Sequence, residues 1–172
     1  GDVYKRQVLD DTQPLAKLSI AESEYRIALA SEVRLLAEQS DRDTLTFPDI
    51  LLDDVSARVQ AVVDVQQRLF QVRRQSLKDA LSALDEKARQ MQEQIAGLER
   101  LQQVNRSKIN SLSGEAGDYR TLFKEGLGDN QRLRELERQV LEYQGENAQH
   151  SAEVAQLRSQ ISENGFQKEI RR

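Results

Sequence analysis

The chain has 172 residues and a formal net charge of -4, with 31% charged residues, 5% aromatic residues and no cysteine. Its charges are of mixed sign without a basic block, which gives nucleic-acid binding no electrostatic basis, and the lack of cysteine excludes disulfides and thiolate metal sites. No apolar run approaches the roughly 18 residues that would span a membrane, and the composition is typical of long helices that bury a narrow stripe. We find no signal peptide, and we expect any leader or membrane anchor to lie in segments absent from this chain.

The first helix is predicted to follow an irregular start. Residues 1–11 show no helical period, and Val8-Leu9 suggests the end of a strand only weakly. Thr12 can cap a helix that runs to about Gln39, and Pro14 falls in its first turn, where the missing N–H costs nothing. The apolar positions of this helix are Leu15, Leu18, Tyr25, Leu29, Val33 and Leu36.

A second helix is predicted over about residues 48–125. Residues 40–44 break the first pattern, and Thr46-Phe47-Pro48-Asp49 reads as a cap followed by proline in the first helical position. The early apolar positions of the second helix are Val55, Val59, Val62, Leu69 and Val72. If the chain folds back near Leu45, these positions face the first helix in an antiparallel pair.

The antiparallel pair predicts specific neighbours. Leu36 would lie opposite Val55, and Leu29 opposite Val62. In the same register Thr12 would lie opposite Asp79, and Arg172 opposite Leu84. The two ends of the chain are therefore expected to meet at one level along the long helix.

The strongest signal is a pair of stripes with alternating steps of three and four residues, which mirror each other about Gly126-Leu127-Gly128-Asp129. The ascending stripe is Leu84, Ala88, Met91, Ile95, Leu98, Gln102, Asn105, Ile109, Leu112, Ala116, Tyr119 and Phe123. The descending stripe is Leu133, Leu136, Val140, Tyr143, Asn147, His150, Val154, Leu157 and Ile161. Such a repeat is the signature of a coiled-coil seam, and the glycine-rich tetrapeptide is the best turn signal in the chain.

The two stripes predict an antiparallel hairpin with its tip at residues 126–129. Phe123 would meet Leu133, Tyr119 would meet Leu136, and Leu98 would meet Leu157. A third helix over about 129–172 starts at Asp129, a good N-cap.

We expect a kink or a frayed turn at 113–118, because Gly114 and Gly117 each cost about 1 kcal/mol relative to alanine in a helix. The predicted fold is all-α: residues 12–172 form a long antiparallel coiled-coil hairpin domain, with the additional N-terminal helix packed on the lower part of the long helix.

Polar residues interrupt the seam at one level. They are Gln102, Asn105, Asn147 and His150. Buried polar residues in a coiled coil cost stability but fix register, so we interpret them as a structural polar layer. No carboxylate or second histidine is in register with His150. The sequence contains no catalytic triad, phosphate loop or metal-ligand cluster, and we predict neither an enzyme nor a cofactor.

The tip is the candidate functional site. Leu127 lies between two glycines, where its side chain would be exposed. An exposed apolar residue there is either a requirement of the tight turn or a docking knob for a partner, and we favour the second interpretation. The candidate docking residues are Leu122, Gly126, Leu127, Gly128, Asp129 and Arg132.

Several short motifs in order carry a family resemblance. They are Arg34-Leu35-Leu36-Ala37-Glu38, Phe47-Pro48, Leu69-Phe70 with Arg73, Gly126-Leu127 and Leu136-Glu137-Arg138. In this order the chain resembles the periplasmic adaptor, or membrane fusion, proteins of type I secretion systems. These form the haemolysin D family, and the protease-secretion branch looks closest.

The resemblance implies a role in protein transport across the periplasm of a Gram-negative bacterium. The full-length protein would be anchored in the inner membrane and assemble as a hexamer. It would join an ABC transporter to a TolC-type outer-membrane channel through the hairpin tip. Residues 1–11 would be the remnant of the first half of a lipoyl-like domain that flanks the helical insertion.

The resemblance also implies a tip triad of Arg, Leu and Ser or Thr. Those positions fall on Asp118, Leu122 and Asp129, of which only Leu122 matches. Two other readings remain open at this point. One is a coiled-coil scaffold without a transport role, whose helices continue through Gly126–Gly128 in a parallel dimer; the other is an efflux-pump or phage-tail hairpin with the same physics.

Overall fold

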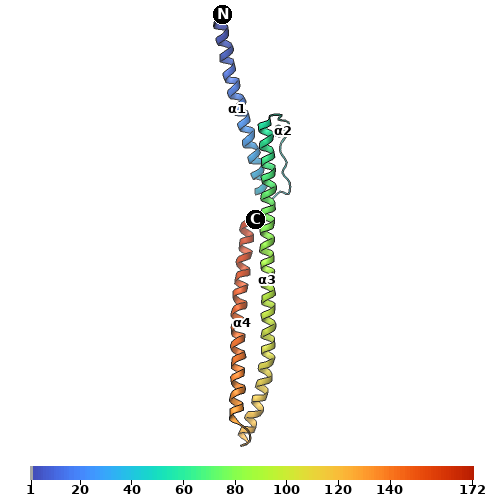
Figure 1. The fold of residues 1–172 in the computed structure, drawn as a ribbon, viewed down its shortest axis with the longest axis vertical. Helices are drawn as coiled ribbons and strands as arrows, with labels where there is room; N and C mark the ends of the chain where they lie inside the picture. Colours follow the sequence, from blue (N-terminus) through green and yellow to red (C-terminus); the bar gives the residue numbers. More distant parts are fainter. Residues whose placement is uncertain (1) are drawn as a thin grey trace. The chain divides into compact units, whose positions relative to one another are not determined.

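The computed structural model describes the backbone of residues 2–172 and the side chains of residues 12–172. Within that range it has four helices and no strand: α1 is Asp2–Gln39, α2 is Asp49–Leu52, α3 is Ala57–Lys124 and α4 is Asn130–Arg171 (Figure 1). The chain divides into two units, Gly1–Ala80 and Leu81–Arg172, and α3 contributes to both. The predicted all-α class is confirmed. Among the described residues, no helix is both long enough and apolar enough to cross a membrane.

The first helix starts earlier than the sequence suggested. α1 begins at Asp2 rather than near Thr12, and it continues through Pro14. Proline in a helix interior removes one hydrogen bond, but residues 5–7 are Lys, Arg and Gln, which favour helix. The strand end considered at Val8-Leu9 is therefore wrong. The assignment of residues 1–11 to a lipoyl-like half stays a prediction.

In the first unit α1 and α3 run in the same direction, so the predicted antiparallel pair is wrong. The Arg26 guanidinium pairs with Asp54 at 2.6 Å, Arg34 Nε donates to Gln66 Oε1 at 2.5 Å, and Arg73 pairs with Glu38 at 3.5 Å. As the residue number in α1 rises from 26 to 38, the number of its partner rises from 54 to 73, which is the order expected of parallel helices. Residues 40–56 return along the outside of the pair instead of turning tightly at Leu45 (Figure 1).

The returning segment supplies much of the core of this unit. Phe47, Leu51 and Val59 are buried with Ala30 of α1, and Leu29, Val33, Leu45, Val62 and Val63 pack around them. The predicted neighbours Leu29 and Val62 share this core. Leu36 and Val55 do not pair, because they are 52% and 90% exposed. Thr12 has no place opposite Asp79 in a parallel pair, so the expected convergence of the chain ends loses its basis.

A bend separates α2 from α3, where the sequence predicted one continuous helix from Pro48. Pro48 has extended backbone at the N-cap of α2, and Leu51 N–H bonds to its carbonyl at 2.9 Å. After four residues α2 ends, because Asp54 Oδ1 accepts a hydrogen bond of 2.8 Å from Ser56 N–H. Such an Asx turn competes with the helical bond and restarts the helix at Ala57.

The second unit is the predicted antiparallel hairpin of α3 and α4. Asn164 Nδ2 donates to the Leu84 carbonyl at 3.0 Å near the open end, and Arg158 pairs with Glu99 at 3.0 Å. Nearer the tip, Leu112 and Tyr119 pack on a buried core of Ala116, Leu133 and Leu136. α3 stays helical through Gly114 and Gly117, so the frayed turn expected at 113–118 does not form.

Candidate functional site

The reversal at the tip is a helix C-cap followed directly by an N-cap. Leu127 N–H bonds to the Leu122 carbonyl at 2.8 Å, and Gly126 N–H bonds to the Phe123 carbonyl at 3.0 Å. With Gly126 at φ 77, these two bonds form a Schellman motif. The turn predicted at Gly126–Gly128 is thus found, and its first glycine supplies the left-handed conformation that ends α3.

The second half of the turn starts α4. The Asp129 side chain accepts a hydrogen bond of 2.9 Å from Gln131 N–H, as expected of the predicted N-cap. Gly128 has φ 106, and a Cβ added there would lie 3.3 Å from Leu122 Cβ. The close approach and the positive φ together explain why this position holds glycine.

An apolar surface covers the end of the hairpin. Leu127 is 60% exposed and Leu122 is 41% exposed. A hydrophobic contact between these two positions commonly accompanies a Schellman motif, so part of the apolar character belongs to the turn itself. The exposed remainder is held in place by fixed backbone bonds, which makes it a pre-organised surface.

Phe123 adds to this surface and was missed by the sequence analysis. The repeat placed it in the seam opposite Leu133, but its side chain is 52% exposed, whereas Leu133 is buried. The seam opens in the last turn of α3, because the chain there must diverge to reach Gly126. The one sequence signal for this is that Gly126 follows Phe123 by only three residues, less than one helical turn.

Charged pairs surround the apolar end. Arg132 bonds to Glu115 at 3.2 Å and lies 3.4 Å from Glu135, while Arg120 pairs with Glu137 at 3.0 Å. The pKa of the Arg132 guanidinium is raised above its ordinary value, chiefly by the hydrogen bond to Glu115. Arg132 therefore ties α4 to α3 below the tip instead of projecting from it as a free cation.

The predicted polar layer forms a connected network across the seam. Asn105 is 5% exposed, and its Nδ2 donates to Asn147 Oδ1 and to Glu146 Oε2, each at 3.1 Å. Gln102 Nε2 donates to the Asn147 carbonyl at 3.2 Å and to Ser151 Oγ at 2.7 Å. Asn147 Nδ2 in turn donates to the Gln102 carbonyl at 3.2 Å.

Three of the four predicted members thus bond to one another. His150 does not join them, since its buried Nδ1 has no hydrogen-bond partner among the described residues. Glu146 and Ser151 complete the network, although neither lies on the predicted stripes. Over the described residues, no group of three or more His, Cys, Asp or Glu is arranged to hold a metal ion.

Comparison with known proteins gives consistent matches. Residues 14–172 match the family model described as AprE, long alpha-helical hairpin. Among curated proteins, the chain is 29% identical over 156 residues to the type I secretion system membrane fusion protein PrsE of Rhizobium meliloti (strain 1021). The match covers 90% of this chain and 36% of PrsE, so the chain spans about a third of the length of that relative.

A solved structure has the same fold. The crystal structure of the soluble domain of LipC, a membrane fusion protein of a type I secretion system, superposes with a TM-score of 0.87 and 26% sequence identity. The similarity covers 92% of this chain and 75% of that one.

Proposed function

This chain belongs to the AprE long alpha-helical hairpin family, and we propose that it is the adaptor segment that docks a type I secretion system onto its outer-membrane channel. The family resemblance carried by the short motifs of the sequence is thereby confirmed, as is the helical hairpin itself. In this proposal the full-length protein lies in the periplasm, is anchored in the inner membrane, and works with an ABC transporter and a TolC-type channel. Six copies would form the conduit.

The observation that carries the docking role is the exposed apolar pair Leu122 and Leu127 on a turn fixed by two backbone hydrogen bonds. Rigid apolar anchors of this kind contribute most when a partner pocket removes them from water. The hairpin beneath supplies length, because each helical residue adds 1.5 Å along the axis. The ATP-driven chemistry would belong to the transporter.

The straight-rod form of the alternative scaffold is incompatible with the geometry at the tip. Gly126 and Gly128 both have positive φ, and bonds between α3 and α4 such as Asn105 to Asn147 close within one chain. A scaffold role for the hairpin has no comparable supporting observation.

Secretion by cells that express full-length protein with its own transporter and channel tests the proposal. Leu127→Asp is expected to abolish secretion without changing helix content, since a charge cannot enter an apolar pocket unpaired. Leu122→Ala is expected to reduce it strongly. Leu141→Asp is the matched control, because Leu141 is 67% exposed on α4 away from the turn. Wild-type secretion from both tip variants would remove the docking role.

A further inference from the structure

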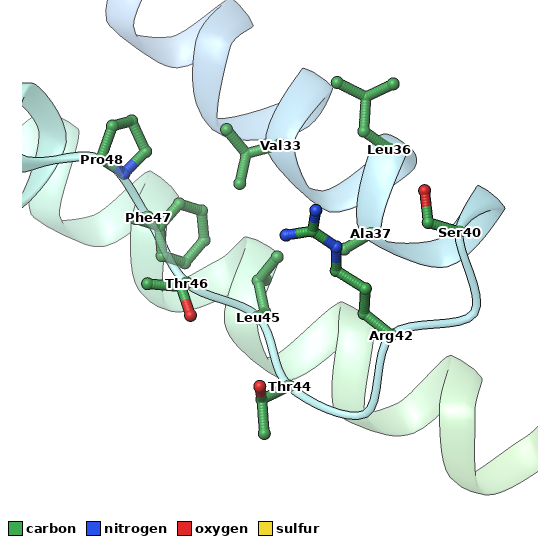
Figure 2. A pocket seen from close by; sticks show the side chains of 10 residues that line it. All are labelled: Val33, Leu36, Ala37, Ser40, Arg42, Thr44, Leu45, Thr46, Phe47 and Pro48. Atoms are coloured by element: carbon green, nitrogen blue, oxygen red, sulfur yellow. The ribbon is translucent and has the colours of Figure 1, made fainter.

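A surface groove in the first unit lies far along the sequence from the tip residues. It has a volume of about 480 Å³ and runs between the last turns of α1 and the extended segment that follows them (Figure 2). Val33, Leu36 and Ala37 of α1 form one wall, and Leu45 and Phe47 form the other. Both walls of the groove are therefore mainly apolar where a ligand would contact them.

The wall formed by residues 44–47 has the character of an unpaired strand edge. A bend at Thr44 leads into residues 45–47, which belong to no helix and follow a nearly straight path in Figure 2. Thr44 and Thr46 are exposed, Leu45 is half-buried and Phe47 is buried. None of its backbone N–H or carbonyl groups makes a backbone hydrogen bond to another described residue. Unpaired main-chain groups beside an apolar groove are the template on which peptides add as a strand.

The cationic side chain of Arg42 lines the same groove. The Arg42 side chain points toward Ala37 and Phe47 in Figure 2. Its main-chain carbonyl accepts a hydrogen bond from Arg74, but its guanidinium makes no ion pair or hydrogen bond with any described residue. Its neighbours are engaged otherwise: Arg34 pairs with Glu38, and Arg74 pairs with Asp43. Arg42 is thus available for a carboxylate on a partner.

We propose that this groove binds an extended peptide segment of a partner protein. The peptide adds as a strand along residues 44–47, places an apolar side chain between Leu36 and Phe47, and pairs a carboxylate with Arg42. Main-chain bonds supply affinity in this mode, while the apolar side chain and the acid supply specificity. The site is separate from the proposed docking tip, and neither proposal depends on the other.

A random peptide library displayed on phage, selected on the whole 172-residue chain, provides the probe. Enrichment of sequences that combine an acidic residue with alternating apolar residues is expected. A synthetic peptide of the enriched sequence should bind wild-type protein, and Arg42→Gln should weaken it by about tenfold, the value of one charge-assisted hydrogen bond. No enrichment, or equal binding to Arg42→Gln, would overturn the proposal.

A matched pair of variants tests strand addition. Thr46→Pro removes one backbone N–H and suits an extended conformation, whereas Thr46→Val keeps the N–H and changes the side chain only. Successive N–H groups of an extended chain point to opposite edges, so only some of them can face the peptide. Thr44→Pro and Leu45→Pro therefore test the N–H groups at the other two positions. At least one proline variant should lose peptide binding with an unchanged circular dichroism spectrum, while Thr46→Val binds as wild type.

One alternative occupant is a second copy of the chain. Sedimentation of the wild-type chain and of Arg42→Glu distinguishes it. A monomer in both excludes a second copy as the occupant, as the proposal requires. A wild-type dimer that Arg42→Glu dissociates would mean that the groove is filled by another copy, and the proposal would be wrong.

Discussion

Asn105 and Asn147 bond to each other across the hairpin, with Nδ2 of Asn105 donating to Oδ1 of Asn147 at 3.1 Å. Asn147 also exchanges hydrogen bonds with Gln102, each to the main-chain carbonyl of the other residue. A shift of either helix by one residue would break all three bonds at once. Apolar contacts on the same seam tolerate such a shift better, so we propose that the polar network fixes the register.

Asn105→Ala is expected to lower the free energy of unfolding by about 1–3 kcal/mol, because it leaves Asn147 Oδ1 without its partner in the seam. Urea denaturation of the whole chain, followed by circular dichroism, measures the change. Asn110→Ala is the control, since Asn110 is exposed on the same helix and the substitution has the same intrinsic effect on helix propensity. Equal effects from the two variants would contradict the role of the network.

Replacing both asparagines separates stability from register. Asn105→Leu with Asn147→Leu is expected to be about as stable as wild type, because no lone partner is left between the two residues. Spin labels at positions 98 and 157 should lie about 10 Å apart in wild type, the spacing of packed helices. In the double variant their distance distribution should broaden, and an equally narrow distribution would count against register control by these residues.

The hairpin was predictable from sequence, whereas the arrangement of the first unit was not. In the hairpin, the repeat and the turn signal at Gly126-Leu127-Gly128 agree on one register. In the first unit, an apolar stripe on a helix reads the same from either end, so it does not encode whether two helices run parallel or antiparallel. The direction depends on the connection.

The sequence predicts a turn at Leu45, but the connection is the longer segment of residues 40–56. Residues 40–56 are long enough to return along α1, since each extended residue spans about 3.3 Å. The return is favoured because it buries Phe47 and Leu51, which a tight turn would expose. At the tip, the six candidate residues do lie in the turn or its flanks. The exposure of Phe123 was not predictable, because it depends on where the two helices diverge, and the heptad repeat does not encode that point.

The Arg34-Leu35-Leu36-Ala37-Glu38 motif joins α1 to α3. Arg34 is 7% exposed, bonds to Glu38 at 2.8 Å and donates to Gln66 at 2.5 Å. Glu38→Ala removes the carboxylate that neutralises a buried guanidinium, and it is expected to destabilise the first unit by about 3 kcal/mol. Hydrogen exchange of α1 amides, measured by mass spectrometry, should rise in this variant.

Glu32→Ala is the matched control for the motif, because Glu32 is exposed one turn and a half earlier on the same helix. Exchange in α1 should stay near wild type in this variant. If Glu32→Ala and Glu38→Ala speed hydrogen exchange equally, the ion pair between Glu38 and Arg34 does not stabilise α1.

Asp54 should give the first unit a pH-dependent stability. Its pKa is held below the ordinary value of an aspartate, first by the hydrogen bond from Ser56 N–H and further by the Arg26 guanidinium, although burial opposes both. A group whose pKa is lower in the folded state stabilises that state above its unfolded pKa, and this contribution is lost as pH falls through the folded pKa. The loss is therefore expected below about pH 4, the usual pKa of aspartate.

The measurement is the difference in urea midpoint between wild type and Asp54→Asn, taken from pH 7 down to pH 3. Wild type should be more stable at neutral pH, and the difference should shrink in the acidic range as the wild-type carboxylate becomes protonated. Asp64→Asn serves as the control, because Asp64 is exposed on α3 and takes part in no ion pair with another described residue. A difference that stays constant over the whole range would contradict the linkage.

The two glycines of the tip should respond differently to asparagine. Gly126 has φ 77, a left-handed conformation that asparagine adopts at low cost, and a Cβ there would meet nothing within 4 Å. Gly128 has φ 106, outside the small left-handed region, and its Cβ would press on Leu122 at 3.3 Å. Gly126→Asn is therefore expected to change stability by less than about 0.5 kcal/mol, and Gly128→Asn to cost about 1–3 kcal/mol.

The two variants also separate the shape of the tip from its stability. Gly128→Asn displaces Leu122, so it should loosen the hydrogen bond from Leu127 N–H to the Leu122 carbonyl and speed exchange of that amide. Gly126→Asn should leave that exchange rate near wild type. Since both substitutions add the same side chain to the same turn, equal exchange rates would mean that contact with Leu122 does not hold the tip in shape, and the apolar surface would then be set by the hydrogen bonds alone.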